Sequence, residues 1–363
     1  PSLSAPNPCS NSSLCGGSAS NVFLVQANNV TIHDLTVDGD NPGLNSGIVR
    51  KDTDLDARNG IIKNTDATYD SLEVYNTTVK NIYLRGIYST GGSFNFYDNQ
   101  VINIQGDSAS IGIFAWGGPG TIQGNDVSYA NDAISANHSK GIQFLENNVT
   151  FSGSGIHTDN SNDGGGTADL IQSNVVDCTG VGGAYGIWSF VPYAAPTIND
   201  NTITNCAVGL SAWGEGADVV TIFTNNDVIG DGSSGSVGAY ITTDIIGWGY
   251  RDVSVDFSGN EIDGFEIGLY FTADQQTWNP GTYEEKTITA TFEDNKITNN
   301  STDAETGSKG VLNIDASPNW WGSSCGPDQI IGDIDYDPWY LNEFMTETGS
   351  GISGSYTCHT PVS

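Results

Sequence analysis

The chain has 363 residues, and its 11 Lys and Arg against 43 Asp and Glu give a formal net charge of −32. A surface this acidic repels polyanions, which excludes nucleic acid and argues against anionic membranes as partners. The same excess of Asp over Lys is typical of salt-adapted proteins, in which it keeps the surface solvated. The 46 Gly residues, the abundance of Asn, Asp, Ser and Thr, and the lack of helix-forming stretches predict a mainly β protein with many turns.

Cysteine usage and hydropathy predict a secreted or cell-surface protein. Six cysteines form three close pairs in the sequence, Cys9 with Cys15, Cys178 with Cys206, and Cys325 with Cys358, without the spacing of a zinc site. Disulfides in an oxidising compartment are the favoured interpretation, with free buried thiols as the alternative. No apolar run approaches the roughly 18 to 20 residues that a membrane-spanning helix needs, so no membrane insertion is expected.

In chain order we expect an irregular N-terminal segment over residues 1–20, a solenoid over 21–315, and a Trp-rich cap and tail over 316–363. The solenoid is predicted from a repeated unit, Asn-x-Val/Ile, whose intervals of 22 to 27 residues suit one three-stranded coil of a right-handed parallel β-helix. Two longer intervals accommodate surface loops, and the whole solenoid has about ten coils. The repeated Asn residues are Asn99, Asn125, Asn147, Asn174, Asn201, Asn226, Asn260 and Asn295.

Each repeated Asn fits a tight bend between strands, where it can adopt the left-handed conformation and stack as a hydrogen-bonded ladder. A second repeated element, Gly-Ile or an equivalent pair, begins another strand in each coil. Because strand side chains alternate, the residues after this pair face outward, inward and outward. The first outward column is then Tyr88, Phe114, Ser135, His157, Trp188, Ser211, Ile241 and Tyr270, and the second is Thr90, Trp116, Asn137, Asp159, Phe190, Trp213, Thr243 and Thr272.

The repetition stops after Gly310, and the segment Asn319-Trp320-Trp321-Gly322 leads through Gly326-Pro327 to Pro338-Trp339. With the Asn-x-Val/Ile coils, this closure resembles the secreted right-handed parallel β-helix repeat proteins of the pectate-lyase-like superfamily, over roughly residues 20–345. The resemblance implies the architecture and not the activity, because the superfamily includes lyases, hydrolases, epimerases, adhesins and surface-layer components. The motifs of polygalacturonases are absent apart from Asn64-Thr65-Asp66, and the Asp-Pro-His signature of mannuronan epimerases is absent too.

The outward columns are rich in aromatic residues, and exposed aromatic surface usually marks a binding site. Flat rings bind the C–H faces of sugars, and a glycan parallel to the solenoid axis would meet several of them. The predicted carbohydrate-binding residues are Tyr88, Phe114, Trp116, Trp188, Phe190, Trp213 and Tyr270. Two alternatives stay open: loops bury the rings as a satellite core, or the face packs against another copy of the chain.

Candidate catalytic residues project from the same face. His157 and Asp159 leave the central coil together. Asp159 with Glu215, which lies just beyond Trp213, or with Asp132 could supply the carboxylate pair of a glycoside hydrolase, whereas a lyase would need a base. Whether the protein is an enzyme is left open. Calcium is a further option, through Asp52, Asp54 and Asp56 or the run Asp333, Asp335 and Asp337.

The sequence thus favours an extracellular β-helix protein that binds a polysaccharide along its aromatic face, with cleavage undecided. The competing hypothesis is a structural or adhesive surface protein that self-associates through that face.

Overall fold

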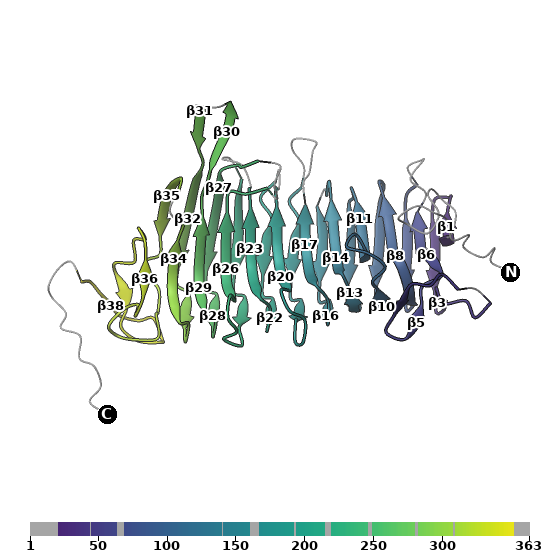
Figure 1. The fold of residues 1–363 in the computed structure, drawn as a ribbon, viewed down its shortest axis with the longest axis horizontal. Helices are drawn as coiled ribbons and strands as arrows, with labels where there is room; N and C mark the ends of the chain where they lie inside the picture. Colours follow the sequence, from purple (N-terminus) through teal and green to yellow (C-terminus); the bar gives the residue numbers. More distant parts are fainter. Residues whose placement is uncertain are drawn as a thin grey trace. The chain divides into compact units, whose positions relative to one another are not determined.

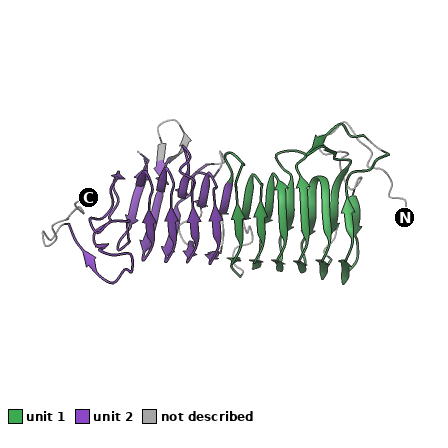
Figure 2. Cartoon of the chain, turned by 90° about the horizontal axis from the view of Figure 1, so that it is seen from below, with its two compact units in different colours: residues 1–184 green, residues 185–363 purple. Residues whose placement is uncertain are grey.

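The structure is a computed structural model that describes residues 21–43, 45–63, 69–139, 141–159, 167–191, 194–214, 219–245, 249–279, 282–307 and 309–351. The chain divides into two compact units, unit 1 (Pro1–Ala184) and unit 2 (Tyr185–Ser363), shown in Figure 2. All regular secondary structure in the described part of the chain is β-strand (Figure 1). The predicted N-terminal segment 1–20 lies outside the described residues, and the predicted boundary at 315 and 316 stays a prediction.

Unit 1 consists of three faces of parallel strands that are paired in register. Face 1 contains β2 (Val30–His33), β7 (Leu72–Tyr75), β9 (Phe94–Tyr97), β12 (Gly120–Gln123), β15 (Ile142–Leu145) and β18 (Leu170–Gln172). Face 2 contains β3 (Thr36–Asp38), the first part of β8 (Thr78–Thr90), β10 (Gln100–Ile104), β13 (Asp126–Ala130), β16 (Asn148–Thr150) and β19 (Val175–Asp177). Face 3 contains β1 (Asn21–Val25), β6 (Ala57–Lys63), the last part of β8, β11 (Ile111–Trp116), β14 (Asp132–Asn137) and β17 (Ser154–Asp159). The short strands β4 (Val49–Arg50) and β5 (Thr53–Asp54) form an antiparallel hairpin.

Unit 2 repeats the three-face arrangement. Face 1 contains β21 (Thr197–Asn199), β24 (Val220–Thr224), β27 (Val253–Ser258), β32 (Thr287–Glu293) and β35 (Val311–Asp315). Face 2 contains β22 (Thr202–Thr204), β25 (Asp227–Ile229), β28 (Glu261–Asp263) and β33 (Lys296–Thr298). Face 3 contains β20 (Tyr185–Phe190), β23 (Val208–Trp213), β26 (Val237–Thr242), β29 (Ile267–Thr272), β34 (Thr302–Thr306) and β36 (Ile330–Ile331). Two antiparallel hairpins, β30 (Gln275–Asn279) with β31 (Thr282–Glu285) and β37 (Trp339–Tyr340) with β38 (Thr348–Gly349), complete the unit.

The chain visits the faces in the order 1, 2, 3 and then returns to face 1 one coil further on, as in the run β12, β13, β14, β15. Parallel neighbours joined by such crossovers, with alternating side chains packed inside, form a parallel β-helix. The predicted fold class, a right-handed parallel β-helix, is confirmed.

The repeated Asn residues form a ladder of buried amides at the bend between faces 1 and 2. In unit 1 the Asn147 Nδ2 donates to Asn174 Oδ1 at 2.9 Å and to the Ile122 carbonyl at 2.9 Å, while its Oδ1 accepts from the Asn125 backbone N–H and Nδ2. The same amide-to-amide bond recurs along each unit at 2.8 to 2.9 Å. The linked pairs are Asn99–Asn125 and Asn125–Asn147 in unit 1, and Asn201–Asn226, Asn226–Asn260, Asn260–Asn295 and Asn295–Asn319 in unit 2.

The left-handed residue at this bend is not the ladder Asn, as we expected, but the residue before it. Positive φ angles of 53° to 68° occur in that position along both units: at Asp98, Gly124, Glu146, Ser173, Asp200, Asn225, Gly259 and Asp294. The preceding residue turns the chain, which leaves the Asn side chain free to enter the interior and bond to its neighbours.

Apolar side chains fill the interior beside the ladders. On face 1 of unit 2 the rings of Phe223, Phe257 and Phe292 are fully buried and stack at centroid distances of 4.2 and 4.4 Å. Identical side chains at equivalent positions of successive coils stack because the strand spacing of about 4.8 Å suits ring contact.

The cap begins as a further coil. Asn319 of the Asn-Trp-Trp-Gly segment occupies the next ladder position, and the backbone N–H of Trp320 donates to the Asn295 carbonyl at 2.9 Å. Trp321 and Trp339 are buried, 3% and 7% exposed. Cys325 is disulfide-bonded, as are Cys178 and Cys206, which agrees with an oxidising compartment, while Cys9, Cys15 and Cys358 lie outside the described residues.

Two adjacent asparagines test the ladder. Asn147 is buried and makes four ladder bonds, whereas Asn148 is exposed and donates to Asp126 at 3.1 Å. Removal of a buried amide leaves its partners unsatisfied at about 1 to 3 kcal/mol each, so we expect Asn147→Ala to lower the free energy of unfolding by several kcal/mol. Asn148→Ala is expected to change it by less than about 1 kcal/mol. Urea unfolding followed by circular dichroism measures both, and equal effects would contradict a stabilising ladder.

Candidate functional site

Face 3 of unit 1 carries the predicted outward columns. The strand register places Tyr88, Phe114, Ser135 and His157 side by side on successive coils. The next outward column contains Thr90, Trp116, Asn137 and Asp159 in the same register. The inward residue between the columns is small, as in Ala115 and Ala136, both fully buried. The columns predicted from the Gly-Ile alignment are therefore correct in this unit.

The aromatic side chains of these columns differ in how open they are. Tyr88 stacks on Phe114 at 5.0 Å, and the Arg85 guanidinium lies 4.9 Å from the Phe114 ring centroid. Phe114 is consequently only 7% exposed. Trp116, in contrast, is 42% exposed and contacts the ring of His138 at 4.4 Å. Trp116 is thus the more exposed of the two rings, Phe114 and Trp116, that β11 contributes.

A polar cluster lies next to these rings. The Ser135 hydroxyl and His157 Nε2 are 2.8 Å apart, and His157 Nδ1 lies 3.4 Å from an Asp132 carboxylate oxygen. The Asn137 amide donates to Asp159 at 2.8 Å. Ser135 and His157 are buried, 1% and 7% exposed. The structure therefore places the predicted residues His157 and Asp159 beside Asp132, the other carboxylate considered as a partner of Asp159, and adds Ser135 to them.

Burial and neighbouring charges shift the pKa values in this cluster. Burial raises the pKa of Asp159 to about 6, from an ordinary value of 3.8, although the charge of His157 acts in the opposite direction. Burial would lower the pKa of His157, but the carboxylates of Asp132 and Asp159 outweigh it, so that this pKa is raised. The Asp132 carboxylate therefore favours the protonated form of His157, and Asp159 binds and releases a proton near pH 6.

Face 3 of unit 2 carries an aromatic cluster, which we define as Tyr185, Trp188, Phe190, Trp213, Tyr240 and Tyr270. Tyr240 stacks on Tyr270 at 5.6 Å, and Trp213 meets Tyr240 edge to face at 5.3 Å. Tyr185 lies 6.4 Å from Trp188 and 6.1 Å from Trp213. Phe190 is buried at 6% exposure, while the other five rings are half-buried. A continuous surface of ring edges and faces therefore crosses four coils.

The sequence alignment missed Tyr240 and Tyr185. It aligned Ala239-Tyr240 with the Gly-Ile pairs and so predicted Ile241 outward, but Ala239 pairs with Leu210 and Ile241 is fully buried. Gly238, one residue earlier, was the signal that would have given the correct register. Tyr185 precedes the repeated pair, so the columns did not include it.

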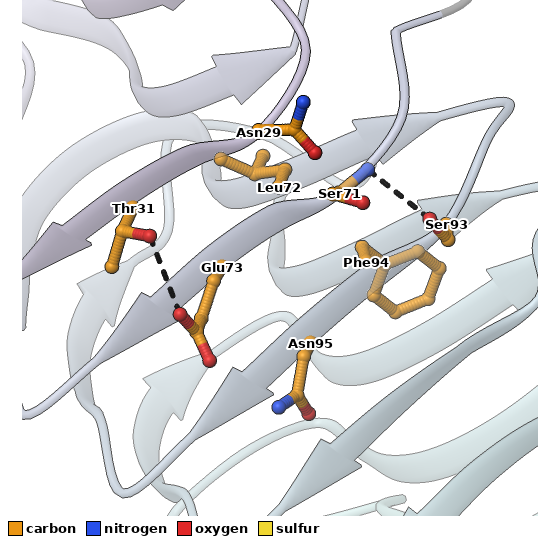
Figure 3. Close-up of a pocket in the computed structure, with 8 residues that line it drawn as sticks. All are labelled: Asn29, Thr31, Ser71, Leu72, Glu73, Ser93, Phe94 and Asn95. Carbon is orange, nitrogen blue, oxygen red and sulfur yellow. Dashed lines mark hydrogen bonds between the residues drawn. The ribbon is translucent and has the colours of Figure 1, made fainter.

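A concave surface lies on face 1 of unit 1, across β2, β7 and β9 (Figure 3). It encloses about 440 Å³, and Glu73 at its centre accepts a hydrogen bond from Thr31 at 3.3 Å. The remaining lining residues are Asn29, Ser71, Leu72, Ser93, Phe94 and Asn95. Tyr97, on the adjacent outward column, donates to the same carboxylate at 3.2 Å and stacks on Tyr75. This groove is open to solvent, and its hydroxyl, amide and carboxylate groups lie beside the apolar side chains of Leu72 and Phe94.

Other predicted features fall outside these sites. Glu215 lies outside the described residues, as does Trp248. No group of three or more His, Cys, Asp or Glu placed to hold a metal ion occurs in the described ranges. Two of the carboxylates considered for calcium, Asp54 and Asp56, accept hydrogen bonds from Ser46 instead. The described residues also contain no helix that could cross a membrane.

Comparison with known proteins identifies a family but no individual relative. The family model described as "Periplasmic copper-binding protein (NosD)" matches residues 97–314, more than half of the chain. Neither the curated proteins nor the solved structures contain a match. The chain belongs to the NosD family, and the match supports a β-helix protein on the extracytoplasmic side of the membrane.

The raised pKa of Asp159 predicts how the stability of the protein depends on pH. Between pH 4 and 6 the folded protein keeps a proton on Asp159 that the unfolded chain has released, so the free energy of unfolding falls as the pH rises through this window. The difference between 3.8 and about 6 corresponds to about 3 kcal/mol. Relative to wild type, the free energy of unfolding of Asp159→Asn should therefore rise by up to this amount between pH 4 and 7. Urea titrations at each pH measure this difference. Asp126→Asn is the control at an exposed carboxylate. If the difference in free energy of unfolding between Asp159→Asn and wild type does not change with pH, the raised pKa of Asp159 is contradicted.

Proposed function

We propose that this member of the NosD family binds an uncharged extracellular polysaccharide along the aromatic cluster of unit 2. The observation that carries the proposal is the run of half-buried rings at Tyr185, Trp188, Trp213, Tyr240 and Tyr270 on successive coils of face 3. Such rings present apolar surface together with polar edges, which is the combination that sugar rings bind.

The cluster is preorganised by hydrogen bonds that hold its rings. Trp213 Nε1 donates to the Ser211 hydroxyl at 3.1 Å, and the hydroxyls of Tyr240 and Thr272 are 3.0 Å apart. Rings held in place lose little conformational entropy when a ligand binds. Because coils repeat at about 4.8 Å, rings two coils apart are separated by about the length of a disaccharide. The ligand is therefore expected to be a chain that lies along the stack of coils.

Charge favours an uncharged glycan over a uronate polymer. The net charge of −32 repels a polyanion. Two of the four cations of unit 2 are already engaged, Lys286 with Glu284 at 2.6 Å and Lys309 with Asp274 at 3.4 Å. A carboxylated polymer would need cations that these residues do not supply.

Copper, which the family description names, does not fit the described residues. Soft ligands and imidazoles bind copper in proteins. The described cysteines are disulfide-bonded, the sequence has one methionine, Met345, and the described ranges hold no group of three His, Cys, Asp or Glu around one point. The proposal therefore includes no copper.

Polysaccharide binding is tested with Trp188→Ala, Trp213→Ala and Tyr240→Ala on an array of neutral and acidic polysaccharides, followed by titration calorimetry with the best ligand. An aromatic contact contributes about 0.5 to 1.5 kcal/mol beyond its buried area, so each variant should weaken binding at least several-fold. Phe344→Ala is the matched control, because Phe344 is a ring of the same unit that is 77% exposed and lies outside the cluster. Trp116→Ala shows whether this exposed ring of unit 1 contributes.

Two results together would overturn the proposal. If no neutral glycan binds, and light scattering shows reversible oligomers that grow with salt and are lost in Trp188→Ala, the cluster is an assembly surface. Salt screens the repulsion between copies of −32 charge to a range of about 8 to 10 Å near physiological ionic strength, which would permit such contacts. A monomer at every salt concentration with tryptophan fluorescence that an oligosaccharide changes supports glycan binding.

A further inference from the structure

The polar cluster on face 3 of unit 1 contains a Ser, a His and an Asp in a linear order. The Ser135 hydroxyl lies 2.8 Å from Nε2 of His157, and the opposite ring nitrogen, Nδ1, lies 3.4 Å from the Asp132 carboxylate. A hydroxyl on one imidazole nitrogen and a carboxylate on the other is the arrangement that activates a serine nucleophile.

We propose that Ser135, His157 and Asp132 form a hydrolytic site for small uncharged acyl esters, such as O-acetyl groups carried on a sugar. The site belongs to unit 1 alone and does not depend on glycan binding by the aromatic cluster of unit 2.

The strand register explains why these residues meet. Ser135 on β14 and His157 on β17 are direct partners in parallel register, so their outward side chains are neighbours on adjacent coils. Asp132 begins β14, three residues before Ser135, and the side chain of Asp132 is 15% exposed and that of His157 9%. Burial strengthens the attraction between the imidazole and the carboxylate and fixes the ring orientation. The contact of 3.4 Å is long for a hydrogen bond, as catalytic contacts often are before a substrate binds.

The surroundings suit an ester on a sugar. Ser135 lies between Phe114 and His157 in its column and is only 1% exposed, so only a small acyl group can approach its hydroxyl. Trp116, in the neighbouring outward column, is 42% exposed and offers a surface for a sugar ring. Asn137 follows two residues after Ser135 on the same side of β14; one of its amide N–H groups donates to Asp159, and the second can stabilise an oxyanion.

The reaction balances with water as the only co-reactant. Ser135 Oγ attacks the acyl carbonyl while its proton passes to His157 Nε2, and the tetrahedral intermediate then expels the sugar hydroxyl, which takes the proton from His157. Water attacks the resulting acyl-serine, again giving its proton to His157. Collapse of this second intermediate releases the carboxylic acid and returns the proton to Ser135. Asp132 stays ionised throughout and stabilises the imidazolium.

The charged groups around His157 define the pH dependence. They are Asp132 on the same face, Asp159 on β17, and Arg85 on β8, whose guanidinium interacts electrostatically with Asp132. Only neutral imidazole accepts the serine proton, so hydrolysis should rise with pH through the raised pKa of His157. Removal of the Asp132 charge should move this rise to lower pH, a readout that a purely structural role would not give.

The experiment uses the intact protein with a fluorophosphonate probe and p-nitrophenyl acetate, from pH 5.5 to 9.5. We expect the probe to label Ser135, as located by peptide mass spectrometry, and Ser135→Ala and His157→Gln each to lower ester hydrolysis at least about a hundredfold. Asp132→Asn should lower it as well and shift the acid limb downward. Ser128→Ala is the matched control, because Ser128 is a half-buried serine of the same unit that lies on face 2, in β13, outside the cluster.

Circular dichroism and thermal unfolding establish that each variant is folded. If Ser135→Ala fails to fold, the labelled peptide of the wild type decides in its place. Wild type that neither reacts with the probe nor hydrolyses the ester at any pH overturns the proposal. Labelling at another serine, or activity that survives Ser135→Ala, overturns it too. None of these outcomes bears on glycan binding by unit 2, which uses different residues and a different assay.

Discussion

The buried Asn amide at the bend between faces 1 and 2 determines how the coils of each unit match one another. Its two N–H groups and one oxygen are all engaged: in unit 2, Asn226 donates to Asn260 and to the Ile198 carbonyl and accepts from the backbone and side chain of Asn201. Only an amide of this length supplies both donors and the acceptor. Since a slip of one residue would turn every side chain to the opposite side of its strand, the ladder also determines which residues face outward.

This constraint explains why most of the fold could be predicted from the sequence. The repeated Asn and the alternation after the Gly-Ile pairs depend on local spacing, and both appear in the structure where the sequence placed them in unit 1. The left-handed residue was assigned one position too late, because Asp98, Glu146 and Ser173 are ordinary residues that nothing in the repeat singles out. In unit 2 the alignment failed at Tyr240, where Ala replaces the usual Ile and the tyrosine resembled the inward residue.

The candidate site could be predicted only in part. The alternation of side chains along β17 places His157 and Asp159 on one face, and the sequence pattern predicted this. The exposure of each outward side chain could not be predicted, because the burial of Phe114 depends on the Arg85 side chain that covers its ring and on stacking with Tyr88. The contact between Asp132 and His157 was also missed, since it joins a strand's first residue to the next coil and depends on side-chain rotamers rather than on spacing.

Two serines at equivalent positions show how one scaffold supports different surfaces. Ser211 lies in register with Trp188 and Tyr240, and its hydroxyl holds the Trp213 indole, so it supports an aromatic surface. Ser135 lies in register with Phe114 and His157, and its hydroxyl contacts the imidazole. The ladder and the core are the same type in both units, and neither requires a particular outward side chain. Outward residues can therefore vary without cost to the coil, so membership of a β-helix family indicates the backbone, while the ligand must be inferred from the outward columns of the individual chain.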